Sequence, residues 1–215
     1  MIEVKKMRIN KALWIVIVSA VMIPLLLNGC GSSRQARFYT LSSVQSPPAA
    51  GKQTTLSDAV TVGIGPIEIP HYLERPQVVT RTSQNELAVS DFDRWGGPLR
   101  PDVSRVVLEN PSIMLASNQV SVVPWTQGGI LHYRVAVDVT RFDATPGKEV
   151  WLKAKWTIFG QDGKTPAMVR ESNIIEPVGG RDASNIVAAM SQALGKLSQD
   201  MANGITAVLS AKPKG

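Results

Sequence analysis

The sequence predicts an α/β protein with a single domain, in which helices cover one or both faces of a mixed sheet. Residues 131–140 and 150–158 alternate between apolar and polar side chains, which is the period of half-buried strands joined in a meander. From Ile186 to Val208, apolar residues recur along one side of a long helix. With 215 residues, 44% of them hydrophobic and 19% charged, the chain can bury a substantial core.

The first 29 residues have the composition of an export signal rather than of a folded segment. A basic stretch is followed by an apolar run over 12–27, which Ser19 and Pro24 interrupt. This order is typical of a secretory signal peptide, and the run is shorter than the roughly 20 residues that a membrane span needs. Either Met1 or Met7 can start the chain, since both precede the apolar run.

The leader ends in a motif that resembles the bacterial lipobox. Gly29 precedes Cys30, the single cysteine of the chain, although Asn28 is an unusual residue at its position. In the lipobox the cysteine receives a diacylglycerol and becomes the mature N-terminus, and several buried acyl chains would hold a domain firmly on a bilayer. The sequence therefore predicts a lipoprotein signal peptide over 1–29 and an N-acyl diacylglycerol on Cys30. The alternative is an uncleaved N-terminal anchor in which the cysteine is incidental.

The leader also accounts for half of the net charge of +6, which arises from 23 basic and 17 acidic residues. It holds four of the basic residues and one of the acidic ones, so the mature chain carries 19 against 16, a net charge of +3. The remaining cations are scattered, and nucleic-acid binding loses its main support. With one cysteine the chain cannot form an internal disulfide, and with two histidines besides it has few ligands for a zinc site.

The mature chain divides into an N-terminal stretch over 30–57 and a folded domain over 58–211. The stretch contains the lipidated N-terminus, a short strand candidate at 38–41, and a linker at 42–57 that is rich in Ser, Pro, Gly and Gln. In the domain we expect strands at 60–64, 77–82, 86–92, 119–125, 131–140, 150–158 and 167–175, and helices that begin near Asp102 and near Asp182 or Ser184.

Local residue chemistry limits some of these elements. Residues 83–85 form the turn of a hairpin. Asn110 precedes Pro111, which disfavours the α conformation at Asn110, so the first helix is expected to stop or kink there. Gly195 and Gly204 weaken the C-terminal helix, each by about 1 kcal/mol relative to alanine.

Motifs that could carry catalysis have simpler interpretations. Residues 160–165 contain the tail of a phosphate-binding loop but lack its first glycine and the helix that follows, so they predict a hairpin turn. Asp91 and Asp93 could act as paired carboxylates, yet no second motif accompanies them. Trp151 and Lys153 could bind a nucleic-acid strand, although cross-strand packing explains this face as well. No nucleophile with a matching base can be assembled from the sequence, which disfavours an enzyme.

Three segments carry a family resemblance. The longest is Gly65-Pro66-Ile67-Glu68-Ile69-Pro70, continued by Tyr72-Leu73 and Arg75-Pro76-Gln77; the others are Tyr39-Thr40-Leu41 and Trp95-x-x-Pro98-Leu99. Through them the chain resembles the PqiC-like family of auxiliary lipoproteins of ABC-type transport systems, over roughly residues 38–210. Gly96-Gly97 departs from the alanine and acidic residue that the family pattern has there. The resemblance implies a fold similar to the N-terminal domain of the periplasmic protein TolB: one three-layer α/β domain around a mixed, largely antiparallel sheet.

The resemblance also implies a function and a location. It implies a non-enzymatic docking component of an MCE-type ABC transport system, which moves lipid or other hydrophobic molecules between the inner and outer membranes. The implied partners are a periplasmic MCE-domain protein and the permease and ATPase of the same system, and a homo-oligomeric ring is a further implication. Gly31, which follows the lipidated cysteine, implies delivery to the outer membrane. No metal and no cofactor other than the lipid on Cys30 is implied.

Tyr72, Leu73, Arg75 and Trp95 are the residues that we expect at a partner interface, because large aromatic side chains and arginines in loops make good anchors. The other interpretation is that Tyr72 and Trp95 pack against the end of the sheet. Two functions besides docking stay open. One is a periplasmic module that itself binds a lipid or hydrophobic ligand, and the more remote one is an envelope hydrolase.

Overall fold

The computed structural model of the chain describes residues 14, 34–44, 60–116, 120–127 and 129–211. The expectations for the signal peptide, for Cys30 and for most of the linker lie outside these residues. The fold belongs to a compact unit that begins at Ala36. It starts earlier along the chain than residue 58, where the sequence analysis placed the domain boundary.

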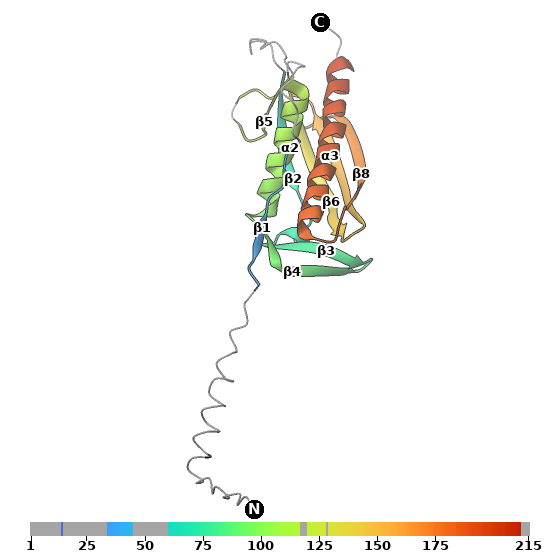
Figure 1. The fold of residues 1–215 in the computed structure, drawn as a ribbon. Coiled ribbons are helices and arrows are strands. Elements are labelled where there is room, and N and C mark those ends of the chain that lie inside the picture. Colours follow the sequence, from blue (N-terminus) through green and yellow to red (C-terminus); the bar gives the residue numbers. More distant parts are fainter. Residues whose placement is uncertain (1–13, 15–33, 45–59, 117–119, 128, 212–215) are drawn as a thin grey trace, which may run out of the picture. The chain divides into compact units, whose positions relative to one another are not determined.

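In this part of the chain, eight strands and two α-helices form the fold (Figure 1). The strands are β1 (Arg37–Tyr39), β2 (Val60–Glu68), β3 (Gln77–Ser83), β4 (Glu86–Trp95), β5 (Val120–Pro124), β6 (Tyr133–Thr145), β7 (Glu149–Phe159) and β8 (Pro166–Pro177). The helices are α2 (Leu99–Leu115) and α3 (Ala183–Ala211), and a 3₁₀ turn, η2 (His71–Leu73), follows β2.

The strands form one mixed sheet with the order β1-β4-β3-β6-β2-β5, and β7 and β8 extend it from the other edge of β6. Strand β6 is central because its first half pairs with β2 in parallel, its end meets β3, and its whole length pairs with β7 in antiparallel. Strand β7 and the part of β6 from Val135 to Thr140 alternate as the sequence predicts, and β8 does so from Ser172 onward. The register of β6 shifts between Val139 and Arg141, and Phe142, Asp143 and Ala144 are all buried. The mixed sheet is therefore confirmed.

Helices α2 and α3 lie side by side on the same face of the sheet (Figure 1). The α/β class, the single domain and the long C-terminal helix are confirmed, but the described residues form two layers and not the three that the family resemblance implied. The reason is the distribution of apolar side chains. The helix-side residues of β6 and β7, such as Val137 and Leu152, are completely or almost completely buried, whereas the opposite face carries charged residues such as Lys153 and Lys155 and offers no surface for a second helical layer.

Helix α2 continues through Pro111 to Leu115, so the expectation of a stop at Asn110 is wrong. Tertiary contacts override the local preference. The Asn110 side chain is fully buried; its Oδ1 accepts a hydrogen bond from the Val44 N–H at 2.8 Å and its Nδ2 donates to Ser198 Oγ on α3 at 3.3 Å. Pro111 and Leu115 are buried on the same helix.

The chain that follows β1 is bound along the helices, and we call residues 40–44 the strap. The Leu41 N–H donates to Asp102 Oδ2 at 2.7 Å, and Arg105 Nη2 donates to the Leu41 carbonyl at 2.6 Å. The Ser42 N–H donates to Ser191 Oγ on α3 at 3.1 Å. Because Leu41 is only 2% exposed, the strap belongs to the core of the domain, and the expected linker is shortened accordingly.

Gly204 of α3 has a packing role that outweighs its poor helix propensity. A Cβ atom at this position would lie 2.5 Å from Cη2 and 2.8 Å from Cζ3 of Trp156 on β7. The indole Nε1 donates to Ser172 Oγ at 3.1 Å, so the ring has little freedom to move away. The glycine lets helix and sheet approach closely enough to enclose this ring.

We predict that Gly204→Ala destabilises the domain by about 1–3 kcal/mol, because the added methyl group overlaps a ring that cannot shift. The gain in helix propensity, about 1 kcal/mol, acts in the opposite direction. Urea unfolding followed by far-UV circular dichroism measures the difference. Asn203→Ala, at an exposed neighbouring position of the same helix, is the matched control and should be nearly neutral. An equal or greater stability of Gly204→Ala would contradict this packing role.

Candidate functional site

A cleft of about 440 Å³ opens at the N-terminal end of α2, and we call it the α2 cleft. It is lined by Glu74, Arg75, Pro76, Trp95, Gly97, Pro98, Leu99 and Arg100. The segment after η2 forms one wall, and the passage from β4 into α2 forms the other. Two of the four residues that we expect at an interface, Arg75 and Trp95, thus come together in one concave surface.

Backbone hydrogen bonds fix the walls of the α2 cleft. The Trp95 N–H donates to the Pro76 carbonyl at 2.7 Å, and the Gly96 N–H donates to the Tyr39 carbonyl of β1 at 2.7 Å. Pro98 immediately precedes the helix, and Leu99, at its first position, is 2% exposed. The apolar floor of the cleft is therefore continuous with the core.

Of the two arginines that line the cleft, one forms ion pairs with described residues and the other does not. Arg100 forms an ion pair with Glu68 at 2.9 Å and a second one with Glu74. Hydrogen bonds from His71 and Arg100 hold the pKa of Glu74 below its usual value. Arg75 is exposed and forms no ion pair within the described ranges. The guanidinium of Arg75, beside the apolar walls, is therefore the group of the cleft that we expect to bind an acidic partner.

Three of the four expected interface residues pack largely within the domain. Leu73 is 1% exposed and Trp95 is 5% exposed, so most of each side chain packs in the core. The half-buried Tyr72 points to the sheet, where its hydroxyl donates to Asp143 Oδ2 at 2.9 Å. Of the four, only Arg75 is exposed. The packing interpretation thus describes Tyr72 and most of Trp95, while the interface hypothesis is left with Arg75 and the exposed edge of Trp95.

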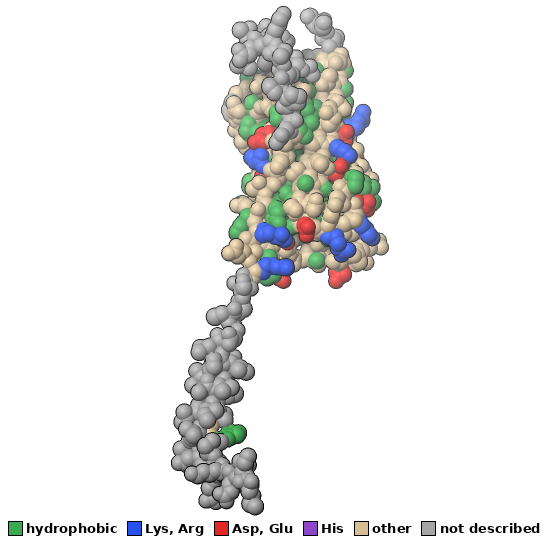
Figure 2. Space-filling view, in the orientation of Figure 1, with side chains coloured by type: hydrophobic (Ala, Val, Ile, Leu, Met, Phe, Trp, Pro, Cys, Tyr) green, Lys and Arg blue, Asp and Glu red, His purple; other side chains and the backbone are tan. Residues whose placement is uncertain are grey.

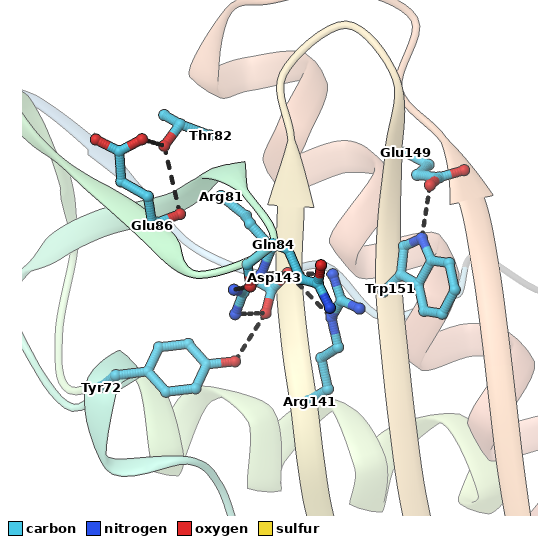
Figure 3. A network of polar contacts seen from close by, with 9 residues as sticks. All are labelled: Tyr72, Arg81, Thr82, Gln84, Glu86, Arg141, Asp143, Glu149 and Trp151. Carbon is cyan, nitrogen blue, oxygen red and sulfur yellow. Dashed lines mark hydrogen bonds and ion pairs between the residues drawn. The ribbon is translucent and has the colours of Figure 1, made fainter.

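Tyr72 belongs to a buried polar cluster around Asp143, which we call the Asp143 cluster (Figure 3). The side chain of Asp143 has no exposed surface. Arg81 donates to both of its oxygens, from Nε and Nη2, at 2.9 Å each. Arg141 donates from Nη2 at 3.0 Å, and its guanidinium lies 4.6 Å from the ring centre of Trp151. Sequence reasoning missed this cluster; the one available signal is an acidic residue between the apolar Phe142 and Ala144.

The electrostatics of the Asp143 cluster fix its protonation states. Burial alone would raise the pKa of Asp143, but the hydrogen bonds from Arg81, Arg141 and Tyr72 outweigh it and hold the pKa below its usual value. Burial, together with the hydrogen bond to Asp143, raises the pKa of Tyr72 to about 12. At neutral pH a carboxylate therefore accepts from a neutral phenol. The cluster clamps the segment that carries Tyr72 and Arg75 onto the sheet, so it positions one wall of the α2 cleft.

Asp93, one of the two histidines and the turn at 160–165 have structural partners. Asp93 accepts hydrogen bonds from Arg37 and Tyr39, and His132 Nδ1 accepts the Thr61 N–H at 3.0 Å. Residues 160–165 form the predicted turn, in which Asp162 accepts the Lys164 and Thr165 N–H groups.

Lys153 pairs with Glu171 on the neighbouring strand at 2.8 Å. On the face that α2 and α3 cover, basic and acidic side chains are interspersed (Figure 2). Neither observation favours nucleic-acid binding.

The described residues provide neither a metal-ligand cluster nor a membrane-spanning helix. Nowhere in them do three or more His, Cys, Asp or Glu side chains gather as metal ligands. Neither described helix has the length and hydropathy needed to cross a membrane.

Comparison with known proteins identifies the family. The family described as "ABC-type transport auxiliary lipoprotein component" matches residues 39–202, which is most of the chain. The chain belongs to this family. The match begins at Tyr39 in β1 and includes the strap, the α2 cleft and the Asp143 cluster, and it confirms the PqiC-like resemblance of the sequence. A transport auxiliary lipoprotein of this kind is not expected to hold a cofactor.

Two curated relatives of this transport auxiliary lipoprotein carry the name "Intermembrane transport lipoprotein PqiC". They come from Escherichia coli (strain K12) and Shigella flexneri, and each is 26% identical over 147 residues, which is 67% of this chain and 73% of the relative. Protein XCC0632 from Xanthomonas campestris has a similar crystal structure, with a TM-score of 0.64 at 16% identity, covering 81% of this chain and 97% of that one. A second crystal structure, of an uncharacterized protein, has a TM-score of 0.65 at 18% identity and covers 80% of this chain and 99% of the other. These structures support the fold.

We predict that Asp143→Asn lowers the free energy of unfolding at pH 7 by about 3–5 kcal/mol, because two arginines lose their buried counter-charge. The native pKa of Asp143 lies below the unfolded value of about 3.9, so its stabilisation is present above that pH and is lost as the pH falls through the native pKa. The difference between wild type and variant should therefore narrow below about pH 4.

Urea unfolding at pH 7, 5 and 3.5 measures this difference. Glu171→Gln, which removes a carboxylate from an exposed pair, is the control, and we expect it to change stability by less than about 1 kcal/mol. A gap between wild type and Asp143→Asn that stays constant over the whole pH range would show that the charge of Asp143 is not what stabilises the cluster.

Proposed function

We propose that this lipoprotein is a non-enzymatic docking component of an MCE-type ABC transport system, anchored in the outer membrane through acyl chains on Cys30. In this role it connects a periplasmic MCE-domain protein, and through it a permease and an ATPase, to the membrane that receives or supplies lipid or other hydrophobic molecules. Membership of the transport auxiliary family supports this assignment. The name of the curated relatives, which describes an intermembrane transport lipoprotein, supports it further.

The single cysteine supports lipid anchoring. Cys30 is the one cysteine of the sequence and follows an apolar run and a glycine, as the lipobox requires. The folded unit begins at Ala36, only six residues later, so a lipidated Cys30 would place the domain directly at the membrane. Several acyl chains, each CH₂ contributing about 0.8 kcal/mol on burial, give an anchor that does not dissociate readily.

We predict that Cys30→Ala removes the protein from outer-membrane fractions separated on a sucrose gradient. The intact mass of the wild-type protein should correspond to a chain that starts at residue 30 and carries three acyl groups, as the N-acyl diacylglycerol requires. Ser32→Ala, which changes a polar residue beyond the lipobox, is the control and should remain in the membrane fraction. If Cys30→Ala keeps its leader and still sediments with outer membranes as wild type does, the uncleaved anchor replaces the lipid in this proposal.

The α2 cleft supports a docking role because it combines the exposed Arg75, which forms no ion pair with any described residue, with apolar walls that include Trp95. Arginine and tryptophan are enriched at the energetic centres of interfaces. The Asp143 cluster and the backbone hydrogen bonds of Trp95 hold both walls before a partner arrives, which reduces the entropy lost on binding. An acidic residue of the partner, flanked by an apolar side chain, matches this surface.

We predict that Arg75→Glu abolishes co-purification of the MCE-domain partner and leaves the melting temperature unchanged, because the Arg75 side chain is exposed. Arg170→Glu on the exposed edge strand β8 reverses an equivalent charge away from the cleft and should keep the partner bound. Trp95→Ala should instead lower stability by about 3–5 kcal/mol, since the ring is mostly buried. Retention of the partner by Arg75→Glu would exclude the α2 cleft as the docking site.

A second candidate function is a module that itself binds a lipid or hydrophobic ligand. Two features of the α2 cleft favour it: the floor is apolar, and the volume of the cleft lies within the range of small-ligand sites. Native mass spectrometry of the purified protein separates the two functions. A lipid bound at stoichiometric occupancy supports the binding module, and a lipid-free protein that still captures the MCE-domain partner supports docking.

A further inference from the structure

The strap determines how far the folded domain can lie from a lipid anchor, and this inference rests on the proposed lipidation of Cys30. Seven peptide units separate Cys30 from Arg37, the first residue of β1. A fully extended chain spans at most about 3.6 Å per residue, so Arg37 lies within about 25 Å of Cys30. If β2 were the first fixed element, the same reasoning would allow a distance of more than about 100 Å between Cys30 and Val60.

The strap cannot easily release this length, because hydrogen bonds to both helices hold it. Asp102, Arg105 and Asn110 of α2 bind its backbone at 2.7, 2.6 and 2.8 Å. The buried Leu41 side chain adds an apolar contact with the core. A lipid on Cys30 would therefore hold the domain to the membrane at its β1 end.

An exposed aromatic side chain lies at this end. Phe38 of β1 is 67% exposed and pairs in register with Arg94 of β4. Phe92, which precedes that pairing on β4, is 36% exposed. Single exposed apolar residues are ordinary on protein surfaces, but Phe38 stands only eight residues after the proposed lipid attachment site.

We propose that the β1 end of the domain rests on the bilayer surface and that Phe38 enters the interfacial region of the lipid. An aromatic ring gains from leaving water at the boundary between headgroups and acyl chains. Near Phe38, Asp93 and Arg37 form an ion pair at 2.9 Å, so these two groups add little net charge to the contact.

This orientation also determines where the α2 cleft lies relative to the bilayer. Trp95 of the cleft pairs in register with Tyr39 of β1, and both helices begin at the end of the domain where β1, β3 and β4 lie (Figure 1). The cleft therefore opens close to the bilayer surface. A partner that binds there meets the lipoprotein at the level where a conduit for lipid has to end.

Site-directed spin labelling tests the proposal on the full lipidated chain in vesicles of phosphatidylethanolamine and phosphatidylglycerol. Acylation occupies the single native cysteine, so Phe38→Cys supplies a unique thiol for a nitroxide. We expect the ratio of accessibility to oxygen over accessibility to a water-soluble nickel complex to be several-fold higher at residue 38 than in an Ile130→Cys variant. Ile130 is 72% exposed and lies in the connection between β5 and β6. A Phe92→Cys variant provides a second position, where an intermediate ratio is expected.

Equal ratios at residues 38 and 130 would overturn the proposal. Low accessibility of residue 38 to both reagents would also overturn it, because the side chain would then be covered by protein, such as a second copy of the chain. Flotation with vesicles distinguishes this outcome from failure of the proposed anchor. If wild type floats and Cys30→Ala does not, the anchor stands whatever the label at residue 38 reports.

Discussion

The buried amide of Asn110 connects the three parts of the domain that lie on the helical side of the sheet. It accepts the Val44 N–H of the strap and donates to Ser198 of α3, while its own backbone belongs to α2. A buried amide needs partners for both its donor and its acceptor, so the strap and the two helices are constrained to one arrangement. This constraint makes the N-terminal segment part of the domain and sets the short length of chain that remains for an anchor.

The Asp143 cluster performs a comparable task on the opposite face of the sheet. A carboxylate without exposed surface is stable there only because two arginines and a tyrosine donate to it. Since Tyr72 comes from the segment before Arg75, the cluster fixes the conformation of one wall of the α2 cleft. Tyr72 thus helps to hold this surface in place, and Arg75 is exposed on it.

These two clusters give the proposed function a consistent geometry. With a lipid on Cys30, the strap would keep the domain close to the membrane, with Phe38 exposed at the β1 end and the α2 cleft beside it. A docking protein for a lipid conduit needs these properties, because the conduit has to end at the bilayer and its end has to be held. The edge strand β8 has no part in this arrangement.

The sequence by itself predicted the export leader and the candidate lipid site, and it determined the period of the main strands and of α3, because charge, hydropathy and alternation are local properties of the chain. Tertiary structure decided the rest. Tyr72 and Asp143 are 71 residues apart in sequence, and Val44 and Asn110 are 66 apart, so no local pattern announces their contacts. The hydrogen bonds of Asn110 keep α2 helical through Pro111, and close packing against Trp156 explains why residue 204 is a glycine. The helices share one face because only that face of the sheet is apolar along its length, which becomes evident once the strands are placed side by side.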